Sequence, residues 1–363
     1  SMKVIGADLW ATSGNRNDGL VMRLSGNNSN WTTWEVDTDS IPDGYGADIM
    51  LCNDIVHIAI GFDAWQWWQD GGGVARFDLA DHDGNGTSEE WITPLIEDNS
   101  NIADRDARAL ACDESNNILY IGFDTYDVGI DRFSYNSNNF IGTLTTDRGI
   151  SPDNVFPGGM LHDDNLLLVA HYGGNAGITR VITSGTTASN AQVLSTGMDA
   201  CSIVRSPSES SRIYAIGRSG ESSGINRVDR LDNTGLIEGG FDELVGLPSG
   251  MVHEIISNGT HVWVTVGSQA DSYLGSTILQ GEILNGSVNW QRGYNAIYDS
   301  INEILLLDDE IWLSTVGGGL WSVNLSQKTF HPTPAPLHNQ MDGLLFDGEK
   351  MYVGLMGWSG SSA

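Results

Sequence analysis

Lysine is almost absent from this 363-residue chain, which carries it only at Lys3, Lys328 and Lys350. Lysine and arginine together number 17 against 47 aspartate and glutamate residues, so the formal net charge is −30 at pH 7. A surface of this sign repels nucleic acid phosphates and anionic lipids. We therefore expect no nucleic acid partner and a solvated acidic surface, with a calcium-rich or cationic-ligand environment as the functional alternative.

Cysteine is scarce as well, at three residues, Cys52, Cys112 and Cys201. An odd number at wide spacing predicts no disulfide framework, and no pair has the spacing of a zinc site. The sequence therefore favours three small, buried thiols on innermost strands of different repeats.

Long apolar runs and catalytic signatures are also missing. No stretch approaches the roughly 18 apolar residues of a membrane-spanning helix, so we expect no membrane insertion. The chain has no G-x-S-x-G, H-E-x-x-H or P-loop motif. No signal peptide is visible, Ser1-Met2 is typical of an expression remnant, and the abrupt end at Ala363 predicts a domain cut from a longer protein.

What the chain does contain is a repeat. Apolar residues come in runs of four to six, and 45 glycines with many Asn, Asp and Ser residues mark frequent turns, which indicates an all-β protein. Successive copies are separated by 47, 63, 47, 47, 49, 49 and 40 residues. The aligned middle-strand markers are Trp10, His57, Tyr120, Leu167, Tyr214, Trp263, Trp312 and Tyr352.

Four strands per copy with a period in the forties predict a β-propeller of four-stranded blades. We expect residues 1–363 to form a single propeller domain. Seven complete repeats favour seven blades, and the trailing half repeat, Met341–Leu355, keeps eight blades as the alternative. Polar turns such as Asn53-Asp54 and Asp163-Asp164-Asn165 are expected to close the hairpin before each middle strand.

Two copies carry a more specific pattern. Leu247-Pro248 leads to Val262-Trp263-Val264-Thr265, and Ile311-Trp312-Leu313-Ser314-Thr315 leads to Gly317-Gly318-Gly319-Leu320. These residues resemble the repeats of two-component regulator propellers. The resemblance covers two copies well and the rest weakly, and it implies a propeller fold in an extracellular or periplasmic setting.

The second repeat is 16 residues longer than the commonest copy because of two insertions. The first holds Asp63, Trp65, Trp67 and Trp68, in the loop between the second and third strands. In a propeller, these loops open on one face, where aromatic rings offer stacking surfaces for sugars. Other copies add, on the same face, Asp124, Tyr126, His171, Tyr172, Arg218 and Tyr273. The alternative is that the rings pack over neighbouring blades or close the channel mouth.

The second insertion is Asp81-His82-Asp83-Gly84-Asn85-Gly86-Thr87-Ser88-Glu89-Glu90. Oxygen-bearing side chains at positions 1, 3 and 5 with glycine at position 6 are typical of EF-hand-like calcium loops. The expected ligands are Asp81, Asp83, Asn85, the backbone oxygen of Thr87, and Glu89 or Glu90. Position 12 is Ile92 rather than glutamate, so the motif is similar to helix-free loops of dockerins, and an Asx-rich turn without metal is the alternative. A bound Ca²⁺ is expected to be structural.

The leading hypothesis is a non-catalytic, extracellular or cell-surface binding domain, expected to be a monomer, that recognises a glycan or a protein on its Trp-rich face. A propeller-fold glycan lyase or hydrolase is the first alternative, because three histidines, two arginines and a glutamate are expected near the same face. That set comprises His162, His171, His253, Arg105, Arg108 and Glu254. A purely structural domain is the second alternative.

Overall fold

The protein is described from a computed structural model. The structure describes residues 1–13, 20–25, 31–35, 40–61, 71–82, 85–135, 137–145, 149–173, 177–184, 187–194, 199–205, 213–219, 225–232, 234–241, 250–268, 277–284, 287–291, 301–307, 310–315, 320–324, 327–331, 341–346 and 351–355. The chain divides into two units, Ser1–Ala200 and Cys201–Ala363.

The described residues of the first unit form four sheets and one short helix, and the strands pair in sequence order within each sheet. Its elements are β1 (Met2–Ile5), β2 (Asp8–Ser13), β3 (Leu20–Leu24), β4 (Trp31–Glu35), β5 (Tyr45–Cys52), β6 (Ile55–Gly61), β7 (Gly73–Asp78), β8 (Glu90–Leu95), α1 (Glu97–Ser100), β9 (Ala107–Asp113), β10 (Ile118–Phe123), β11 (Ile130–Ser134), β12 (Asn139–Leu144), β13 (Asn154–Asp163), β14 (Leu166–Tyr172), β15 (Ile178–Ser184) and β16 (Thr187–Leu194).

The second unit contains three four-stranded sheets and a final pair of strands among its described residues. Its first strand begins at the boundary between the units. The strands are β17 (Asp199–Arg205), β18 (Ile213–Ser219), β19 (Ile225–Leu231), β20 (Ile237–Phe241), β21 (Gly250–Ser257), β22 (His261–Ser268), β23 (Thr277–Leu284), β24 (Ser287–Gln291), β25 (Ile301–Leu307), β26 (Glu310–Thr315), β27 (Leu320–Asn324), β28 (Gln327–His331), β29 (Met341–Phe346) and β30 (Met351–Leu355).

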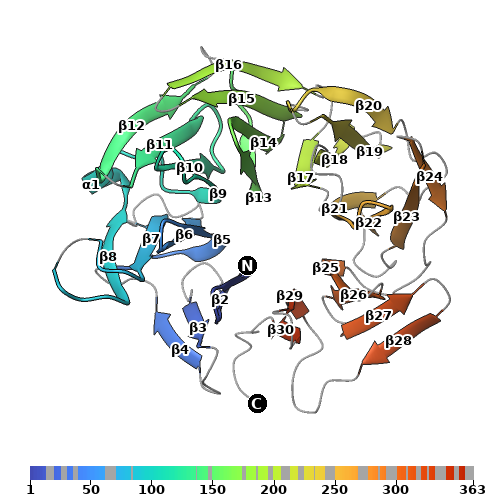
Figure 1. The fold of residues 1–363 in the computed structure, drawn as a ribbon, viewed down its shortest axis with the longest axis horizontal. Helices are drawn as coiled ribbons and strands as arrows, with labels where there is room; N and C mark the ends of the chain where they lie inside the picture. Colours follow the sequence, from blue (N-terminus) through green and yellow to red (C-terminus); the bar gives the residue numbers. More distant parts are fainter. Residues whose placement is uncertain are drawn as a thin grey trace. The chain divides into compact units, whose positions relative to one another are not determined.

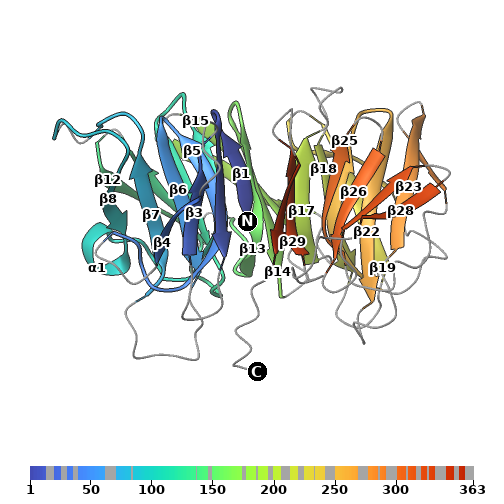
Figure 2. The same ribbon diagram turned by 90° about the horizontal axis from the view of Figure 1, so that it is seen from below.

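The predicted repeat is confirmed at the level of strands. All eight aligned markers, from Trp10 to Tyr352, fall on the second strand of a sheet. Within the first unit, the first strands β5, β9 and β13 lie on the inner side and the last strands β8, β12 and β16 on the outer side (Figure 1). The strands of this unit lie nearly along one axis and alternate in direction (Figure 2), so strand ends gather at two opposite ends of it. None of the described helices is long and apolar enough to cross a membrane.

The middle strands of the second and third sheets are buried on both faces because each of these sheets packs between two others of the first unit. Every residue of β6, β7 and β10 is buried. Along β10 the side chains alternate: Leu119 and Ile121 join the core cluster shared with the second sheet, whereas Ile118 and Tyr120 join the one shared with the fourth. Alternate side chains of the strand therefore pack against different neighbouring sheets. Both sets must be apolar, which explains why the strand sequences are continuous apolar runs.

The expected hairpin turns are also present in the described part. Asn53 and Asp54 have φ values of 50° and 57°, and Asn117 and Asp164 have values of 59° and 51°. Asparagine and aspartate tolerate this left-handed region better than other residues with a Cβ atom. The turns at 308–309 and 347–348 lie outside the described residues.

The cysteine prediction is wrong for two of the three residues. Cys52, at the end of β5, forms a disulfide with Cys112 in β9, and their Cα atoms are 5.8 Å apart. Parity and spacing along the chain gave no sign of this bond because they ignore which strands become neighbours. The first strands of consecutive sheets pack side by side, so two cysteines 60 residues apart in sequence come within bonding reach.

Candidate functional site

Part of the predicted ligand face lies outside the described residues. This applies to Asp63, Trp65, Trp67 and Trp68 in the first insertion and to Tyr273 in the second unit. Arg218 lies in β18 opposite Asn226, in the second unit, but its side chain is not described. Their role in binding stays a prediction. Asp124, Tyr126, His171 and Tyr172 can be placed in the first unit.

These four residues lie at the end of the first unit where second strands finish and first strands begin. Tyr172, the last residue of β14, pairs with Asn154, the first residue of β13. Asp124 directly follows β10, and its backbone N–H donates to the carbonyl of Asp106 at 2.9 Å. Antiparallel pairing thus places residues from both strands of each sheet at one end, here called the rim.

The carboxylate of Asp124 is the centre of a hydrogen-bonded cluster at the rim. Arg108 lies 2.8 Å from its Oδ2 atom, the side-chain amide of Asn154 donates to Oδ1 at 2.7 Å, and the Tyr172 hydroxyl donates to Oδ1 as well. We name the Asp124 cluster by its members: Tyr45, Asp106, Arg108, Asp124, Asn154 and Tyr172. These residues come from three consecutive sheets, so the cluster joins them at the rim.

Arg108 is held on several sides. Its Nε and one terminal nitrogen donate to the two oxygens of Asp106 at 2.6 and 3.0 Å, and its guanidinium lies 4.7 Å from the centre of the Tyr45 ring. Burial opposes its charge, but the hydrogen bonds and charge of Asp106, with smaller effects of Tyr45 and Asp124, raise the pKa of Arg108 above its ordinary value. Arg108 is therefore a permanent cation between two carboxylates.

A β-bulge produces the position of Arg108. Ala107 pairs with Phe123 and Ala109 with Gly122, so Arg108 is an extra residue in β9. The same irregularity recurs near the start of other first strands, where the inserted residues are Ala47, His253, Asn302 and Asp342. A β-bulge changes the direction in which a side chain points at a strand end. In this chain the bulge occurs at the same place in several sheets, near the start of the first strand. No residue pattern in the chain predicted these bulges.

Gly61 is required beside this cluster. A Cβ atom at this position would lie 2.9 Å from Cζ of Tyr45 and 3.0 Å from Oδ1 of Asp106. Both distances are shorter than normal van der Waals contact, so any other residue displaces a member of the Asp124 cluster.

Tyr126 differs from its neighbours because its side chain points to solvent, with 66% of its surface exposed. The loop that carries it is nevertheless well anchored. Thr125 Oγ1 donates to Asp104 Oδ1 at 3.0 Å, and the Asp127 N–H donates to the Pro152 carbonyl at 2.6 Å. The rim therefore presents an aromatic ring from a fixed backbone.

His171 lies beneath the rim rather than on it, with 1% of its surface exposed. Its Nδ1 atom is 2.9 Å from the carbonyl oxygen of Asp153, and its Nε2 atom is buried without a hydrogen-bond partner among the described residues. Burial lowers the pKa of His171 to about 4, so the ring is neutral at physiological pH. Tyr172 also keeps its proton, because burial, and then its bond to Asp124, raise its pKa.

The residues proposed for a lyase are not brought together in the first unit. His162 pairs with Leu167 at the turn end of β13, opposite to the rim end that holds Arg108. It stacks on Tyr120 with ring centres 5.5 Å apart and lies 3.4 Å from Asp113. Arg105 is paired with Glu97 at 2.8 Å. His253 and Glu254 belong to the second unit, and their side chains are not described.

The predicted calcium loop connects β7 and β8, and its described part is folded by its own hydrogen bonds. Gly86 N–H donates to Asp81 Oδ1 at 3.1 Å, and Thr87 N–H donates to Asn85 Oδ1 at 2.8 Å. Glu89 lies 3.0 Å from Arg23, and Glu90 accepts from the Asn85 amide at 2.5 Å.

Asp83 lies outside the described residues, and the described ones contain no group of three His, Cys, Asp or Glu side chains suited to a metal. The hydrogen bonds that Asp81 and Asn85 accept from Gly86 and Thr87 are typical of an Asx turn, so the described residues alone do not form a calcium site. Calcium binding stays a prediction.

Solved structures match the chain at low sequence identity. Sqt1 of Saccharomyces cerevisiae aligns with a TM-score of 0.63 and 10% identity, covering 96% of this chain and 90% of that one. The Cps50 (Swd1) β-propeller domain of Myceliophteria thermophila gives 0.52 and 12%, covering 84% and 91%. A chain of a mitotic checkpoint complex gives 0.55 and 12%, covering 88% of each.

No protein-family model and no curated protein matches the sequence. At these identities, the structural likeness shows the fold alone. The chain has a β-propeller fold of four-stranded antiparallel sheets, as its repeats predict. Blade number and the resemblance to two-component regulator propellers stay predictions.

Proposed function

We propose that the protein is a non-catalytic binding propeller whose rim recognises a hydroxyl-rich ligand, a neutral glycan in the first place. The observation that carries this proposal is Tyr126, a strongly exposed ring on an anchored loop, two residues after Asp124 of the Asp124 cluster. Exposed rings stack on the apolar faces of sugars, and ionised carboxylates accept strong hydrogen bonds from hydroxyl groups.

The charge of the rim narrows the ligand class. The Asp124 cluster contains two carboxylates, and its one guanidinium is already bonded to both. A uronate or another polyanion would face uncompensated negative charge there, in a chain of net charge −30. Neutral sugars fit this rim better than the acidic polysaccharides that a lyase cleaves, which weighs against the lyase form of the enzyme alternative.

A protein partner is the second candidate, and the acidic rim favours one that offers a basic segment. One structural neighbour is a component of a mitotic checkpoint complex, which illustrates a propeller in an assembly. For this chain, the charge of the rim supports the idea, and the likeness of folds does not.

An extracellular or cell-surface location is part of the proposal. The Cys52–Cys112 disulfide supports it, because such bonds persist in oxidising compartments and are rare in the cytosol. The near absence of lysine and the acidic surface are compatible with it. A monomeric state and a structural Ca²⁺ in the 81–90 loop complete the proposal.

The test is a glycan array probed with the wild type, with Tyr126→Ala, and with a Trp65/Trp67/Trp68→Ala triple variant. We expect a defined set of neutral glycans to bind the wild type and to lose about tenfold or more in both variants. Leu236→Ala is the matched control, since Leu236 is 42% exposed in the second unit. Equal signals from all four proteins, or no bound glycan, would contradict the proposal that the rim binds a glycan. Capture of a basic peptide that depends on Tyr126 would support the second candidate.

A further inference from the structure

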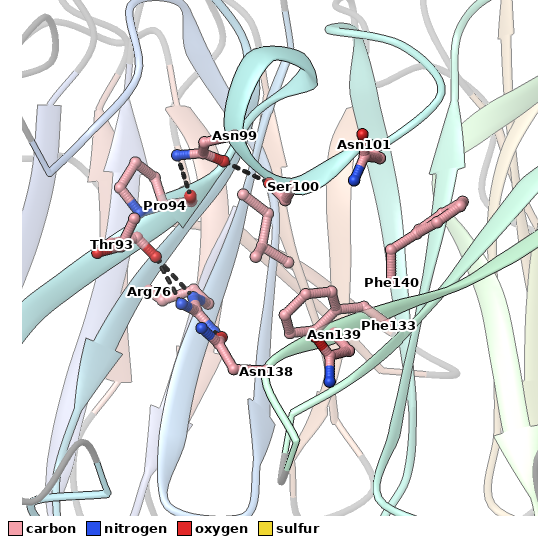
Figure 3. A pocket seen from close by; sticks show the side chains of 11 residues that line it. Arg76, Thr93, Pro94, Asn99, Ser100, Asn101, Phe133, Asn138, Asn139 and Phe140 are labelled. Carbon is pink, nitrogen blue, oxygen red and sulfur yellow. Dashed lines mark hydrogen bonds between the residues drawn. The ribbon is translucent and has the colours of Figure 1, made fainter.

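A pocket lies away from the rim, on the third and fourth strands of the second and third sheets. Its cavity volume is about 150 Å³. It is formed by β7, β8, helix α1, β11 and β12 (Figure 3). The buried part consists of Arg76, Pro94, Leu95 and Phe133, while the side chains at the mouth are exposed amides on both sides. The pocket thus has a deep base with one charged group and a neutral polar mouth.

Arg76 is the unusual component of this base. Only 3% of its surface is exposed, and no carboxylate among the described residues forms an ion pair with it. Its Nε and one terminal nitrogen both donate to the Thr93 carbonyl, at 2.9 and 2.6 Å, and the other terminal nitrogen donates to Asn138 Oδ1 at 2.9 Å. These three bonds use three of the five N–H groups of a guanidinium. All three of these hydrogen bonds therefore go to uncharged oxygen acceptors.

The surroundings do little to stabilise this cation. Burial lowers the pKa of Arg76 to about 10, although the charge of Asp78 acts in the opposite direction. Asp78 is itself occupied, because it accepts from the Ala80 N–H at 2.9 Å and from His82 Nδ1 at 2.7 Å. The Arg76 guanidinium lies 5.4 Å from the centre of the Phe133 ring. A buried cation without an anion is costly, and an incoming anion removes that cost.

The charge and polarity of the residues that line the pocket determine which class of anion it can bind. None of the residues that line the pocket is acidic, although 47 of the 363 residues of the chain are. The mouth carries the amides of Asn99 and Asn139, which can donate hydrogen bonds. Leu95, Phe133 and Phe140 also line the pocket, and the Phe133 ring is next to the guanidinium. The net charge of −30 repels large polyanions, so a small, singly charged ligand with an apolar body fits best.

We propose that this pocket binds a small organic carboxylate, with its carboxylate group on Arg76 and its apolar part against Phe133 and Phe140. A planar guanidinium suits a carboxylate because two parallel N–H groups meet two oxygens. The site is separate from the rim, so its ligand is independent of the one proposed there.

The experiment measures binding to the full chain by calorimetry and ligand-observed NMR at constant ionic strength. Benzoate and propionate are the probes, benzamide and propionamide are their neutral counterparts, and inorganic phosphate tests other anions. We expect the carboxylates to bind at least about tenfold more tightly than the amides, since the amides cannot pair with a buried cation. Equal binding of acids and amides overturns the proposal, and phosphate binding as tightly as benzoate overturns its carboxylate specificity.

Two substitutions locate the site. Asn139→Asp places a carboxylate at the exposed mouth without changing side-chain size, and we expect it to weaken benzoate binding about tenfold through like-charge repulsion. Asn117→Asp, in the turn between β9 and β10 where Asn117 has a φ of 59°, is the matched control and should leave affinity unchanged. Arg76→Gln should abolish binding, and if that variant does not fold, the Asn139 and Asn117 pair still decides. Equal affinity in these two variants contradicts the assignment.

Discussion

At the scale of single residues, Asp131 shows how the packed sheets affect a charge. It is fully buried in β11, and its two oxygens accept from the Ala103 N–H and the Thr143 hydroxyl, both at 2.6 Å. Burial is the largest influence and raises the pKa of Asp131 to about 6, although these hydrogen bonds act against the shift. The folded state therefore keeps a proton that the unfolded chain releases near pH 3.8.

This difference predicts a specific pH dependence. Between pH 3.8 and about 6 the folded state binds more protons at Asp131, so its contribution to the free energy of unfolding falls as pH rises through that window. The full loss is about 3 kcal/mol. Asp131→Asn cannot titrate, so its stability relative to the wild type should increase by up to this amount from pH 4 to pH 7. Urea unfolding of both proteins at several pH values measures it.

The comparison cancels other titrations. His57 and His171, whose pKa values burial lowers to about 3 and about 4, are the same in both proteins and drop out of the difference. A difference between variant and wild type that stays constant from pH 4 to pH 7 would show that Asp131 titrates normally.

At the scale of elements, the disulfide joins two first strands, β5 and β9. Cross-linking residues 60 apart restricts the unfolded chain, and the loop-entropy relation gives about 4 kcal/mol of stabilisation. We expect Cys52→Ser/Cys112→Ser to lose about this much free energy of unfolding, and reductant to destabilise the wild type but not the variant. Cys201→Ser is the control, and it should keep the full response to reductant. A wild type insensitive to reductant, with free thiols by mass spectrometry, contradicts the bond.

The 81–90 loop gives a second prediction at this scale. If Asp81, Asp83 and Asn85 hold Ca²⁺, a hundredfold excess over the dissociation constant should stabilise the fold by about 3 kcal/mol. Thermal melts in calcium and in chelator, at matched ionic strength, measure the gain, and Asp83→Ala should remove it. Asn258→Ala is the control, because Asn258 caps a turn outside the 81–90 loop by accepting from the Thr260 and His261 N–H groups at 3.0 and 2.8 Å. It should lower both melts equally. An identical wild-type Tm in both solutions excludes a calcium staple.

At the scale of the whole molecule, the repeat made the fold predictable. Markers such as Trp10 and Trp312 fall on second strands because each sheet needs the same hydrophobic strand in the same place. Turns such as Asn53-Asp54 follow from backbone geometry, which is local. The architecture of a repeat protein can therefore be predicted well from its sequence, because the local backbone preferences and the packing contacts recur with the same period.

The candidate site was predictable only in part, because its contacts join different sheets. Asp124 and Tyr172 were expected on one face, but nothing in the sequence links them to Arg108 or Asn154, which lie 16 and 30 residues from Asp124. The bulge that inserts Arg108 changes no residue type, so it leaves no sequence signal. The Cys52–Cys112 bond and the buried Arg76 went unpredicted for the same reason: a pair of distant residues is defined by packing, not by spacing.

The net charge gives the last prediction, which concerns salt. A chain of net charge −30 repels itself when compact, and salt screens this repulsion, with a Debye length of about 30 Å at 0.01 M and about 10 Å at 0.1 M. We expect the Tm to rise with KCl in the presence of chelator, mostly below about 0.2 M. The variant Asp54→Asn/Glu114→Gln/Asp164→Asn removes three exposed turn carboxylates. It should have a higher Tm than the wild type at low salt and the same Tm at high salt. A Tm that falls as KCl is added would mean that favourable ion pairs, such as Arg23 with Asp8, outweigh the repulsion.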